Sequence, residues 1–286
     1  MDEDQLVTVL AESPGASALL VDFDGTLAEI VADPDKARAP AAVVEDLHTI
    51  ARHLRTVAVV SGRPAGWLAS RLELASHASP LRAVGLHGLE EVEGSGQVRL
   101  RHGADDYREG LERAMSELSA TLPPGTRIED KGRGVTVHWR ALDWSAGGSA
   151  VEEGIARRAE EVVREVGSRL GFVLRPGKAS IEIVVPLGVD KGTVTRELAS
   201  GHEEVAFIGD DASDLPAFIA LDELSERAGA RATKVAVSGP GEEEAPPLLE
   251  AGADLVLDGP EGVARLLARL SARLRHDSGA AGVSTA

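Results

Sequence analysis

The segment LLVDFDGTL, residues 19–27, ends an apolar run with two carboxylates, Asp22 and Asp24, that are separated by a single residue. Like charges held this close at the edge of a core repel each other, and a divalent cation is the usual means of holding them together. A pair of aspartates at a strand end is equally well explained as a helix cap, so the pair by itself does not establish a metal site.

Further polar clusters follow other predicted strands or begin predicted helices. They are Ser61-Gly62-Arg63, Lys191, and Asp210-Asp211 with Asp214. In an open parallel sheet, ligands bind beyond the carboxyl ends of the strands. Each cluster has a simple structural explanation, since Ser61 and Asp214 are suitable helix caps and a lone lysine is usually solvated surface. All of the clusters in this order are much better explained by a shared site.

The chemistry available to such a site is the hydrolysis of a phosphate monoester. One aspartate can attack phosphorus and form an aspartyl-phosphate, provided that Mg²⁺ offsets the repulsion between the carboxylate and the phosphate. A second carboxylate can protonate the leaving alcohol and then deprotonate the attacking water. A hydroxyl group, backbone N–H groups and a lysine can hold the remaining phosphate oxygens.

The elements that position these residues alternate between strands and helices. Strands are predicted at 18–23, 56–62, 81–88 (with its exit loop), 205–211, 232–239 and 253–259. Helices are predicted at 40–54, 64–74, 191–200 and 261–275, and one more between the strands at 205–211 and 232–239. Continuously apolar strands that alternate with helices are typical of a parallel sheet covered on both faces. The predicted fold class is therefore α/β, with a Rossmann-like parallel-sheet core.

A different pattern interrupts this alternation. Helices are predicted at 104–122 and 151–170, and strands at 126–132, 134–142 and in a hairpin over 172–186. The order helix, strand, strand, helix, strand, strand indicates an α+β module rather than a continuation of the parallel sheet. We therefore predict a core domain made of residues 1–103 and 188–286, and an inserted α+β cap domain, or lid, over residues 104–187.

The composition limits the partners of the protein. The chain has 286 residues, a formal net charge of −17 and no cysteine, which excludes disulfides and thiolate nucleophiles. Such an acidic chain is a poor partner for nucleic acid or for an anionic membrane. It has no apolar run long enough to span a membrane, and its N-terminus lacks the basic region of a signal peptide. We expect a cytoplasmic monomer that acts on a small phosphosugar.

The motifs resemble those of the haloacid-dehalogenase-like phosphatase superfamily, in the same order and over nearly the whole chain. The matching pieces are DFDGT at 22–26, Ser61, Lys191 and GDDASD at 209–214. Within that superfamily the chain resembles the trehalose-6-phosphate phosphatase family, through LVDFDGTLAEI, SGR, GLHGLE, IEDKGRGVTVHWR, KASIEIVVP and DKGTV. The insert between the second and third motifs is similar to the α/β lid of some members of the superfamily.

This resemblance implies a role for each residue of the core clusters. Asp22 would be the nucleophile, and Asp24 the general acid and base. Mg²⁺ would be bound by Asp22, the backbone carbonyl of Asp24, Asp210 and, through water, Asp211. Phosphate would be held by Ser61 and Lys191, with Asp214 orienting Lys191. The other phosphate or substrate contacts would come from Gly25, Thr26, Gly62, Arg63, His87 and Glu90.

The predicted cap carries its own candidate residues. Glu129 and Lys131 lie two residues apart on a predicted strand and therefore share one face of it. Arg140 ends the next strand, and Glu182 lies on a third. Without the other motifs, a solvated sheet face with surface ion pairs is the better explanation. The resemblance implies instead that these four residues contact the sugar.

Two departures from the family pattern leave the sugar open. The last motif of the family commonly reads Gly-Asp-Asp-x-Thr-Asp-Glu, whereas this chain has Ser213 for the threonine and Leu215 for the glutamate, and HWR stands where HYR is usual. The expected function is Mg²⁺-dependent hydrolysis of trehalose 6-phosphate. The alternatives are a phosphatase for sucrose phosphate, mannosylglycerate phosphate or a pseudo-disaccharide phosphate, and a catalytically silent sugar-phosphate-binding partner of a synthase.

Overall fold

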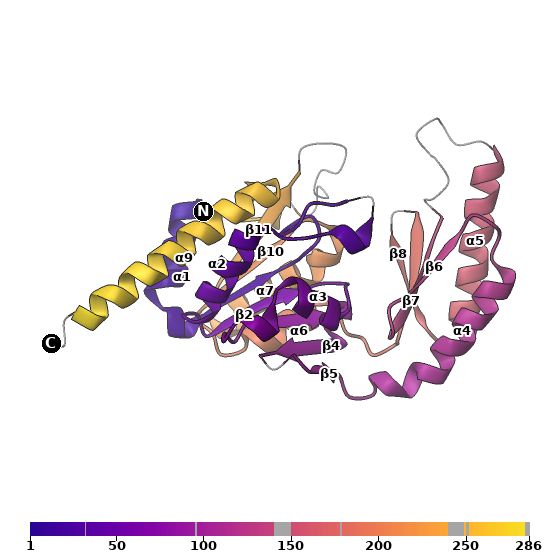
Figure 1. The fold of residues 1–286 in the computed structure, drawn as a ribbon, viewed down its shortest axis with the longest axis horizontal. Helices are drawn as coiled ribbons and strands as arrows, with labels where there is room; N and C mark the ends of the chain where they lie inside the picture. The colour runs from indigo at the N-terminus through magenta and orange to yellow at the C-terminus, as the bar shows by residue number, and fades with distance from the viewer. Residues whose placement is uncertain are drawn as a thin grey trace. The chain divides into compact units, whose positions relative to one another are not determined.

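The computed structural model describes residues 1–31, 33–94, 96–139, 150–177, 179–239, 249 and 252–283. The chain forms two compact units (Figure 1). The first unit comprises Met1–Arg99 and Val189–Ala286, and the second comprises Leu100–Gly188. Among the described residues, no helix is both long enough and apolar enough to cross a membrane.

An eight-stranded sheet forms the centre of the first unit, with the strand order β12-β11-β10-β1-β2-β3-β4-β5 (Figure 1). The strands are β1 (Ser17–Val21), β2 (Thr56–Val60), β3 (Arg82–Gly85), β4 (Glu90–Glu93), β5 (Val98–Leu100), β10 (Glu204–Gly209), β11 (Arg231–Ser238) and β12 (Leu255–Asp258). The strands from β12 to β3 are parallel, whereas β4 pairs with β3 in the antiparallel direction. The prediction of a Rossmann-like α/β core is confirmed.

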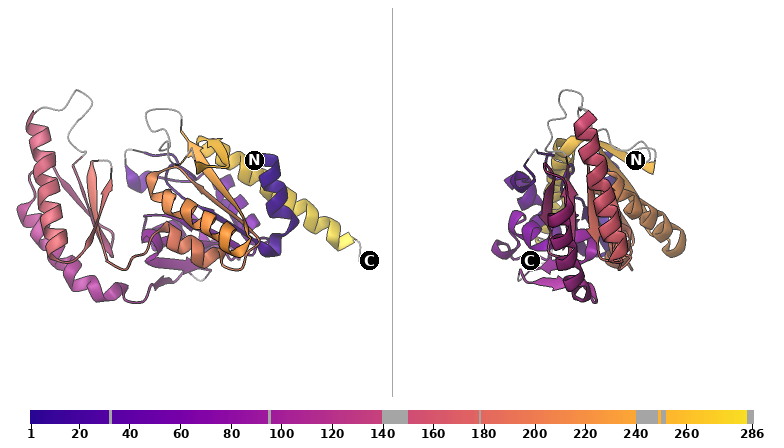
Figure 2. Two further views of the ribbon diagram at one scale, coloured as in Figure 1. Left: turned by 180° about the vertical axis from the view of Figure 1, so that it is seen from behind. Right: turned by 90° about the vertical axis from the view of Figure 1, so that its right-hand side faces the viewer.

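Helices cover both faces of this sheet (Figure 2). They are α1 (Glu3–Glu12), α2 (Ala41–Ala51), α3 (Ala65–Arg71), α6 (Lys191–Ala199), α7 (Leu215–Ala228) and α9 (Gly259–Val283). Leu19 and Val21 of β1 pack in one core with α1, α2, α3 and α9, while Ala18 and Leu20 pack in another with α6 and α7. Alternate residues of the strand enter two different cores, which explains why it is apolar throughout.

The register of β1 brings several predicted site residues to one edge of the sheet. Val21 pairs with Ile208 of β10, and β2 lies on the other side of β1. The pairing continues for one more hydrogen bond, from Asp22 N to Ile208 O at 2.9 Å. Because the three strands are parallel, the residues that follow them, Asp22, Ser61 and Asp210, leave the sheet at the same end.

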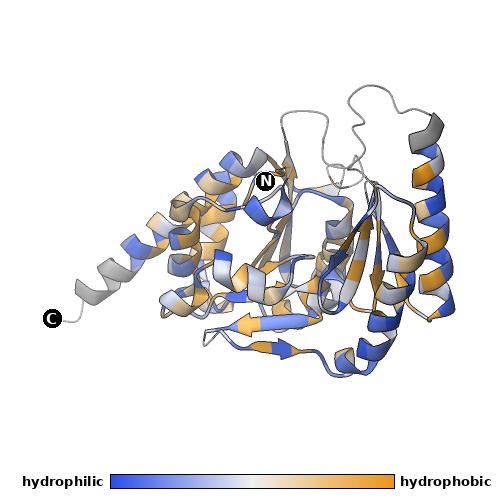
Figure 3. Ribbon diagram, turned by 45° about the vertical axis from the view of Figure 1, so that its right-hand side comes forward, coloured by the Kyte–Doolittle hydropathy of each residue, from blue (hydrophilic) through white to orange (hydrophobic). Residues whose placement is uncertain are grey.

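The second unit contains a separate antiparallel sheet with the strand order β6-β7-β9-β8. Its elements are α4 (Arg108–Thr121), β6 (Arg127–Asp130), β7 (Gly134–His138), α5 (Ala150–Arg169), β8 (Val173–Gly177) and β9 (Ser180–Val184). Both helices pack against one face of this sheet (Figure 1). The side chains of Val135, Val137, Ile181 and Ile183 are buried. Hydrophobic and hydrophilic residues alternate along the helices, as expected for helices with one buried side (Figure 3).

Some elements of the first unit differ from the sequence predictions. Helix α1 and strands β4 and β5 were not predicted, and α9 continues to Val283, beyond the predicted end at residue 275. Strand β4 reads Glu-Glu-Val-Glu with only Val92 buried, so it has no apolar run. Helix α1 begins in an acidic segment, where Asp2 and Gln5 form a capping box. Helix α1 also buries Leu6, Val7, Leu10 and Ala11 in the core, so its apolar face was an available signal that the prediction missed, whereas β4 offers no such signal.

Candidate active site

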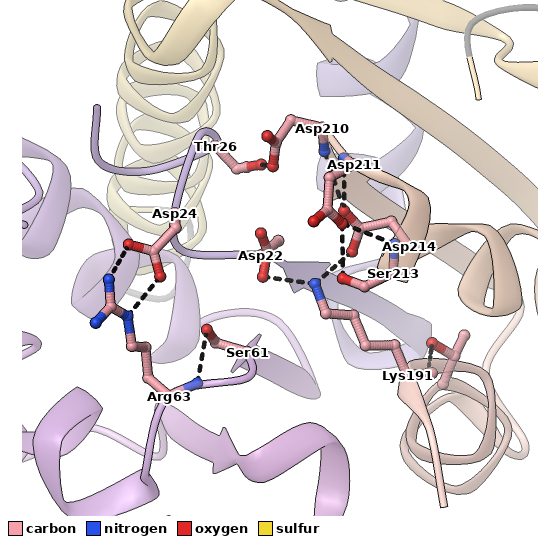
Figure 4. A network of polar contacts seen from close by, with 11 residues as sticks. Asp22, Asp24, Thr26, Ser61, Arg63, Lys191, Asp210, Asp211, Ser213 and Asp214 are labelled. Atoms are coloured by element: carbon pink, nitrogen blue, oxygen red, sulfur yellow. Dashed lines mark hydrogen bonds and ion pairs between the residues drawn. The ribbon is translucent and has the colours of Figure 1, made fainter. Parts of the chain in front are cut away.

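Asp22, the predicted nucleophile, is the first residue after β1 and is 4% exposed. Lys191 Nζ donates a hydrogen bond to Asp22 Oδ1 at 2.7 Å and another to Asp214 Oδ1 at 2.7 Å (Figure 4). Burial alone lowers the pKa of a lysine, but the carboxylates of Asp214 and Asp22 raise the pKa of Lys191 above its ordinary value. Lys191 is therefore a charged bridge between the two aspartates.

The start of α6 fixes the position of Lys191. Asp190 caps the helix, since its side chain accepts a hydrogen bond from Thr193 N at 2.7 Å. A Cβ atom on Gly192 would lie 2.4 Å from Pro216 O, so only glycine allows α6 to approach α7 this closely. The local sequence Asp-Lys-Gly thus caps the helix, presents the ammonium group and permits the close helix contact that brings it to the site.

Asp214 organises the loop after β10. Its Oδ2 accepts hydrogen bonds from the backbone N–H groups of Asp210 and Asp211, both at 3.1 Å, so both of its carboxylate oxygens are engaged. A Cβ atom on Gly209 would lie 2.3 Å from Asp214 Cγ, which explains the glycine at the end of the strand. The Asp211 side chain accepts hydrogen bonds from Ser213 N at 2.8 Å and Ser213 Oγ at 2.6 Å. This geometry fits a supporting role for Asp214.

The turn after β1 packs directly against Asp210. Thr26 Oγ1 donates a hydrogen bond to Asp210 Oδ1 at 3.1 Å. Gly25 has a φ of +79°, and a Cβ atom there would lie 2.0 Å from Asp210 Oδ2. Gly25 N donates to Ala28 O at 2.7 Å, so this N–H group closes the turn. The turn therefore requires glycine at this position, both for its backbone conformation and for the close approach of Asp210.

Carboxylate oxygens of Asp22, Asp210 and Asp214 lie within 4.8 Å of one another. Burial, together with the neighbouring carboxylates, raises the pKa of Asp210 to about 7, and burial raises the pKa of Asp22 well above its ordinary value despite Lys191. When all three carboxylates are ionised, Lys191 balances only one of their charges. A divalent cation supplies the two missing positive charges and prefers oxygen ligands. The cluster therefore fits a divalent metal ion, and Asp22 and Asp210 are better placed to bind it than Asp214.

Asp24, the predicted general acid and base, is held by Arg63. The Nε and Nη2 atoms of Arg63 donate hydrogen bonds to Asp24 Oδ2 and Oδ1, both at 2.8 Å (Figure 4). Arg63 N also donates to Ser61 Oγ at 3.2 Å, and Ser61 is 2% exposed. The guanidinium group, which the sequence analysis assigned to the phosphate or substrate, is therefore directed at a carboxylate of the protein itself.

Three more predicted contact residues, Gly62, His87 and Glu90, lie beside the turn that contains Ser61. A Cβ atom on Gly62 would lie 2.9 Å from His87 Nε2, so the imidazole packs closely over the turn. Glu90 Oε2 accepts a hydrogen bond from Ala65 N at 3.0 Å, at the start of α3. Glu90 therefore caps α3, and the GLHGLE segment supports the turn from one side.

In the second unit, the sheet face opposite the helices is polar. Glu129 of β6 and Glu182 of β9 both pair with the same residue of β7, Thr136, so their side chains share this face. Lys131 Nζ donates a hydrogen bond to Glu182 Oε1 at 3.0 Å, and His138 Nε2 lies 2.8 Å from Glu129 Oε2. The structure therefore brings three of the predicted cap residues together, namely Glu129, Lys131 and Glu182.

Comparison with known proteins identifies the family. Residues 20–245 match the trehalose-phosphatase family. The chain belongs to this family. It is 31% identical over 213 residues to the trehalose-phosphate phosphatase of Mycobacterium ulcerans strain Agy99, an alignment that covers 71% of this chain and 51% of that protein. The chain thus spans about half the length of the mycobacterial trehalose-phosphate phosphatases that it matches.

Solved structures agree with this assignment at the level of the fold. The C-terminal domain of the Candida albicans trehalose-6-phosphate phosphatase aligns with a TM-score of 0.72 and 21% identity, covering 95% of this chain and 98% of that domain. A haloacid dehalogenase-like hydrolase from Bacteroides thetaiotaomicron aligns with a TM-score of 0.56 and 18% identity, covering 89% of this chain and 99% of that chain. The predicted resemblance to the trehalose-phosphatase family is confirmed, and the fold is similar to that of a haloacid dehalogenase-like hydrolase.

Two features of this trehalose-phosphatase family member escaped the sequence analysis. One is the ion pair between Arg63 and Asp24, and the other is the ring of Trp67, which lies 4.9 Å from the Arg63 guanidinium carbon. The four-residue spacing from Trp67 to Arg71 on α3 was an available signal for the second of the two stacking arginines, whereas Arg63 precedes the helix and its contact with Trp67 had no such signal. Arg140 lies outside the described residues, so its contact with the sugar stays a prediction.

Proposed function

We propose that this chain is a Mg²⁺-dependent phosphatase that hydrolyses trehalose 6-phosphate to trehalose and phosphate. The main support is the buried arrangement in which Lys191 bridges Asp22 and Asp214 while Asp210 lies beside them. Membership of the trehalose-phosphatase family supports the choice of substrate. The complete set of carboxylates and the lysine favours turnover over a catalytically silent sugar-phosphate-binding protein.

The metal in this proposal is Mg²⁺ because it favours oxygen ligands and retains some of its water. Asp22 and Asp210 would bind it through their side chains, Asp24 through its backbone carbonyl and Asp211 through a water molecule. When bound, Mg²⁺ neutralises charge on the phosphate and on the carboxylate that must approach it. The crowding of the carboxylates supports this part of the proposal, since burial and mutual repulsion raise the pKa of Asp210.

In the first half of the reaction, a carboxylate oxygen of Asp22 attacks phosphorus, and the bond from phosphorus to the sugar oxygen breaks. Asp24 donates a proton to that leaving oxygen. The Ser61 hydroxyl and the Lys191 ammonium group hold the phosphate oxygens. Lys191 performs this task as a fixed positive charge, because the carboxylates beside it raise its pKa.

In the second half, a water oxygen attacks phosphorus and gives its proton to Asp24. The bond between phosphorus and Asp22 breaks, which restores the carboxylate and releases phosphate. Asp24 ends the cycle protonated, as it began, so the reaction needs no other proton donor. Arg63 and Thr26 act on these groups indirectly, through the Asp24 and Asp210 carboxylates.

The proposal assigns the sugar to residues 104–187, acting as a cap on the core. The sugar hydroxyls would donate hydrogen bonds to the carboxylates of Glu129 and Glu182. They would accept hydrogen bonds from Lys131 and Arg140. Support comes from the contact between Lys131 and Glu182 and the partial exposure of both side chains, 15% and 12%. Groups held in this way are already aligned and still reachable from water.

The test is phosphate release from a panel of phosphosugars, with Mg²⁺ present and after its removal. The panel contains trehalose 6-phosphate, sucrose phosphate, mannosylglycerate phosphate and a pseudo-disaccharide phosphate. We expect the highest kcat/KM for trehalose 6-phosphate, and only with Mg²⁺. A higher kcat/KM for another sugar phosphate would show that this sugar phosphate, and not trehalose 6-phosphate, is the substrate. Tight binding of a panel member without turnover of any of them would show that the protein is a catalytically silent binding protein.

A further inference from the structure

Trp67 of α3 contacts three side chains near the predicted acid-base residue. Its ring centroid lies 4.9 Å from the Arg63 guanidinium carbon, within the range of a cation–π interaction. The ring of Phe23 meets it edge to face, with centroids 5.3 Å apart and an interplanar angle of 86°. Arg71 also lies over the ring, at 4.7 Å. Trp67 is thus the centre of a small aromatic and cationic cluster.

This cluster closes a ring of contacts around Asp24. Phe23, which precedes Asp24 in the chain, packs on Trp67, and Trp67 supports Arg63. Arg63 then donates two hydrogen bonds of 2.8 Å back to Asp24 (Figure 4). Phe23 is fully buried, whereas the side chains of Arg63 and Asp24 are 16% and 31% exposed. Because a partly exposed carboxylate is otherwise free to change rotamer, the ring of contacts is what fixes its direction.

We infer that Arg63 and Trp67 are positioning residues for proton transfer: Arg63 holds the Asp24 carboxylate, and Trp67 holds Arg63. The inference rests on the proposed function, which gives Asp24 its role as acid and base. The inference changes the role of Arg63 from a contact with the phosphate or substrate to a contact with the acid-base residue, Asp24. A carboxylate offers about four lone-pair sites and a bidentate arginine uses two of them, so Asp24 can exchange a proton while it is held.

The expected consequence is specific to the step in which Asp24 donates a proton. A sugar oxygen leaves poorly unless it is protonated, whereas p-nitrophenolate is a stable anion that leaves without protonation. A positioned acid contributes about 10²- to 10⁴-fold to a step that needs it. Loosening the hold on Asp24 should therefore slow the release of the sugar and spare the release of p-nitrophenolate.

The experiment compares first-turnover rates with Mg²⁺ for the wild type, Arg63→Lys and Trp67→Leu. Rapid quench follows trehalose release from trehalose 6-phosphate, and stopped flow follows the burst of p-nitrophenolate from p-nitrophenyl phosphate. The first turnover isolates formation of the aspartyl-phosphate from its hydrolysis, in which Asp24 acts for both substrates. Arg71→Lys is the matched control, because Arg71 stacks on the same ring but donates its hydrogen bond to Asp35 O, at 2.8 Å.

Both Arg63→Lys and Trp67→Leu should slow trehalose release by about 10- to 100-fold and change the p-nitrophenolate burst by less than about threefold. Trp67→Phe, which keeps an aromatic face, should recover most of the rate, and Arg71→Lys should behave like the wild type. Equal losses with both substrates, no loss in Arg63→Lys, or a loss of the same size in Arg71→Lys would each overturn the inference.

Failure of the proposed function gives a different result. If the wild type hydrolyses p-nitrophenyl phosphate and another sugar phosphate but not trehalose 6-phosphate, the proposed substrate is wrong. The same comparison then uses the sugar phosphate that is turned over. The wild-type rates therefore test the proposed function. The roles of Arg63 and Trp67 are tested by comparing how far each variant slows the first turnover of the sugar phosphate and of p-nitrophenyl phosphate.

Discussion

Two charged networks, one in each unit of the molecule, differ in their exposure to water. In the first unit, the side chains of Lys191, Asp22 and Asp214 are at most 6% exposed and are joined by contacts of 2.7 Å. In the second unit, Lys131 and Glu182 are 15% and 12% exposed and are joined at 3.0 Å. One network is sealed from water, and the other is in contact with it.

This difference in exposure has energetic consequences. Removing one partner of a buried pair leaves a charge in a medium that solvates it poorly, at a cost of about 3–5 kcal/mol. A pair in contact with water contributes about 1 kcal/mol or less, because water replaces the lost partner. The sealed network is suited to holding reacting groups in one geometry, while the accessible pair can exchange its partner for a substrate hydroxyl at little cost.

The largest expected effect is that of Asp22→Asn in the sealed network. The change is nearly isosteric, but an amide does not attack phosphorus, so turnover of trehalose 6-phosphate and of p-nitrophenyl phosphate should both fall to the detection limit. Circular dichroism and thermal unfolding serve as controls for the fold. Substantial activity in a well-folded variant would remove Asp22 from the role of nucleophile.

Metal removal is expected to act on the same network. EDTA should abolish activity, and Mg²⁺ should restore it, because the carboxylates need a divalent cation before they can accept a phosphate. The measurement is phosphate release after chelation and during titration with Mg²⁺. Full activity in a metal-free preparation would contradict the metal-dependent mechanism.

The contrast between the two networks is tested directly by matched lysine substitutions. Lys191→Met leaves Asp22 and Asp214 buried without their counter-charge, so it should lower the free energy of unfolding by about 3–5 kcal/mol. Lys131→Met should lower it by about 1 kcal/mol or less. Urea unfolding at neutral pH measures both values. Losses of similar size would show that exposure does not separate the two pairs.

Glu182→Ala should affect recognition rather than chemistry. If Glu182 holds the sugar, the loss of one or two hydrogen bonds to a charged group should lower kcat/KM for trehalose 6-phosphate by about 10- to 100-fold. Hydrolysis of p-nitrophenyl phosphate, which has no sugar, should hardly change. Glu153→Ala, at an exposed position of α5, is the matched control. Equal damage to both substrates would instead assign Glu182 a structural or catalytic role.

The arrangement of the sealed network was largely predictable from the sequence. Burial on both faces makes β1 and β10 continuously apolar, so the strands and their ends stand out. Asp22 and Asp210 follow those ends directly, and parallel strands bring them together. Periodicity and the rule that ligands bind at the carboxyl ends of parallel strands were enough to place these residues.

The partner of each polar group was not predictable in the same way. Arg63 and Asp24 are 39 residues apart, and neither local sequence indicates whether the guanidinium group points to a carboxylate or to a phosphate. That choice depends on the ring of Trp67, which packs on both Phe23 and Arg63. The sequence shows which residues reach the site, whereas packing between distant segments decides which of them touch.

The smallest expected effect is on the pH dependence of stability, through two stacked histidines of the first unit. Burial lowers the pKa of one ring, and a charged partner raises the pKa of the other. The rings of His48 and His77 lie 3.9 Å apart with an interplanar angle of 5°. Burial lowers the pKa of His48 despite its hydrogen bond to Leu72 O, and the charges of His77 and Arg52 lower it further. The hydrogen bond to Glu45 raises the pKa of His77.

The two histidines should contribute to stability with opposite dependence on pH. The contribution of His48 is present above its ordinary pKa of 6.5 and is lost as the pH falls toward its lower folded pKa, because the unfolded chain binds the proton first. The contribution of His77 is present at low pH and is lost as the pH rises through its raised folded pKa. His48→Gln should therefore flatten the acid decline of the free energy of unfolding, by at most about 1.4 kcal/mol per pH unit for one proton, whereas His77→Gln should steepen it. Urea unfolding between about pH 5 and 7.5 measures both slopes. A change of the same sign in the two variants would mean that the hydrogen bond from His77 to Glu45 does not offset the effect of burial on the pKa of His77.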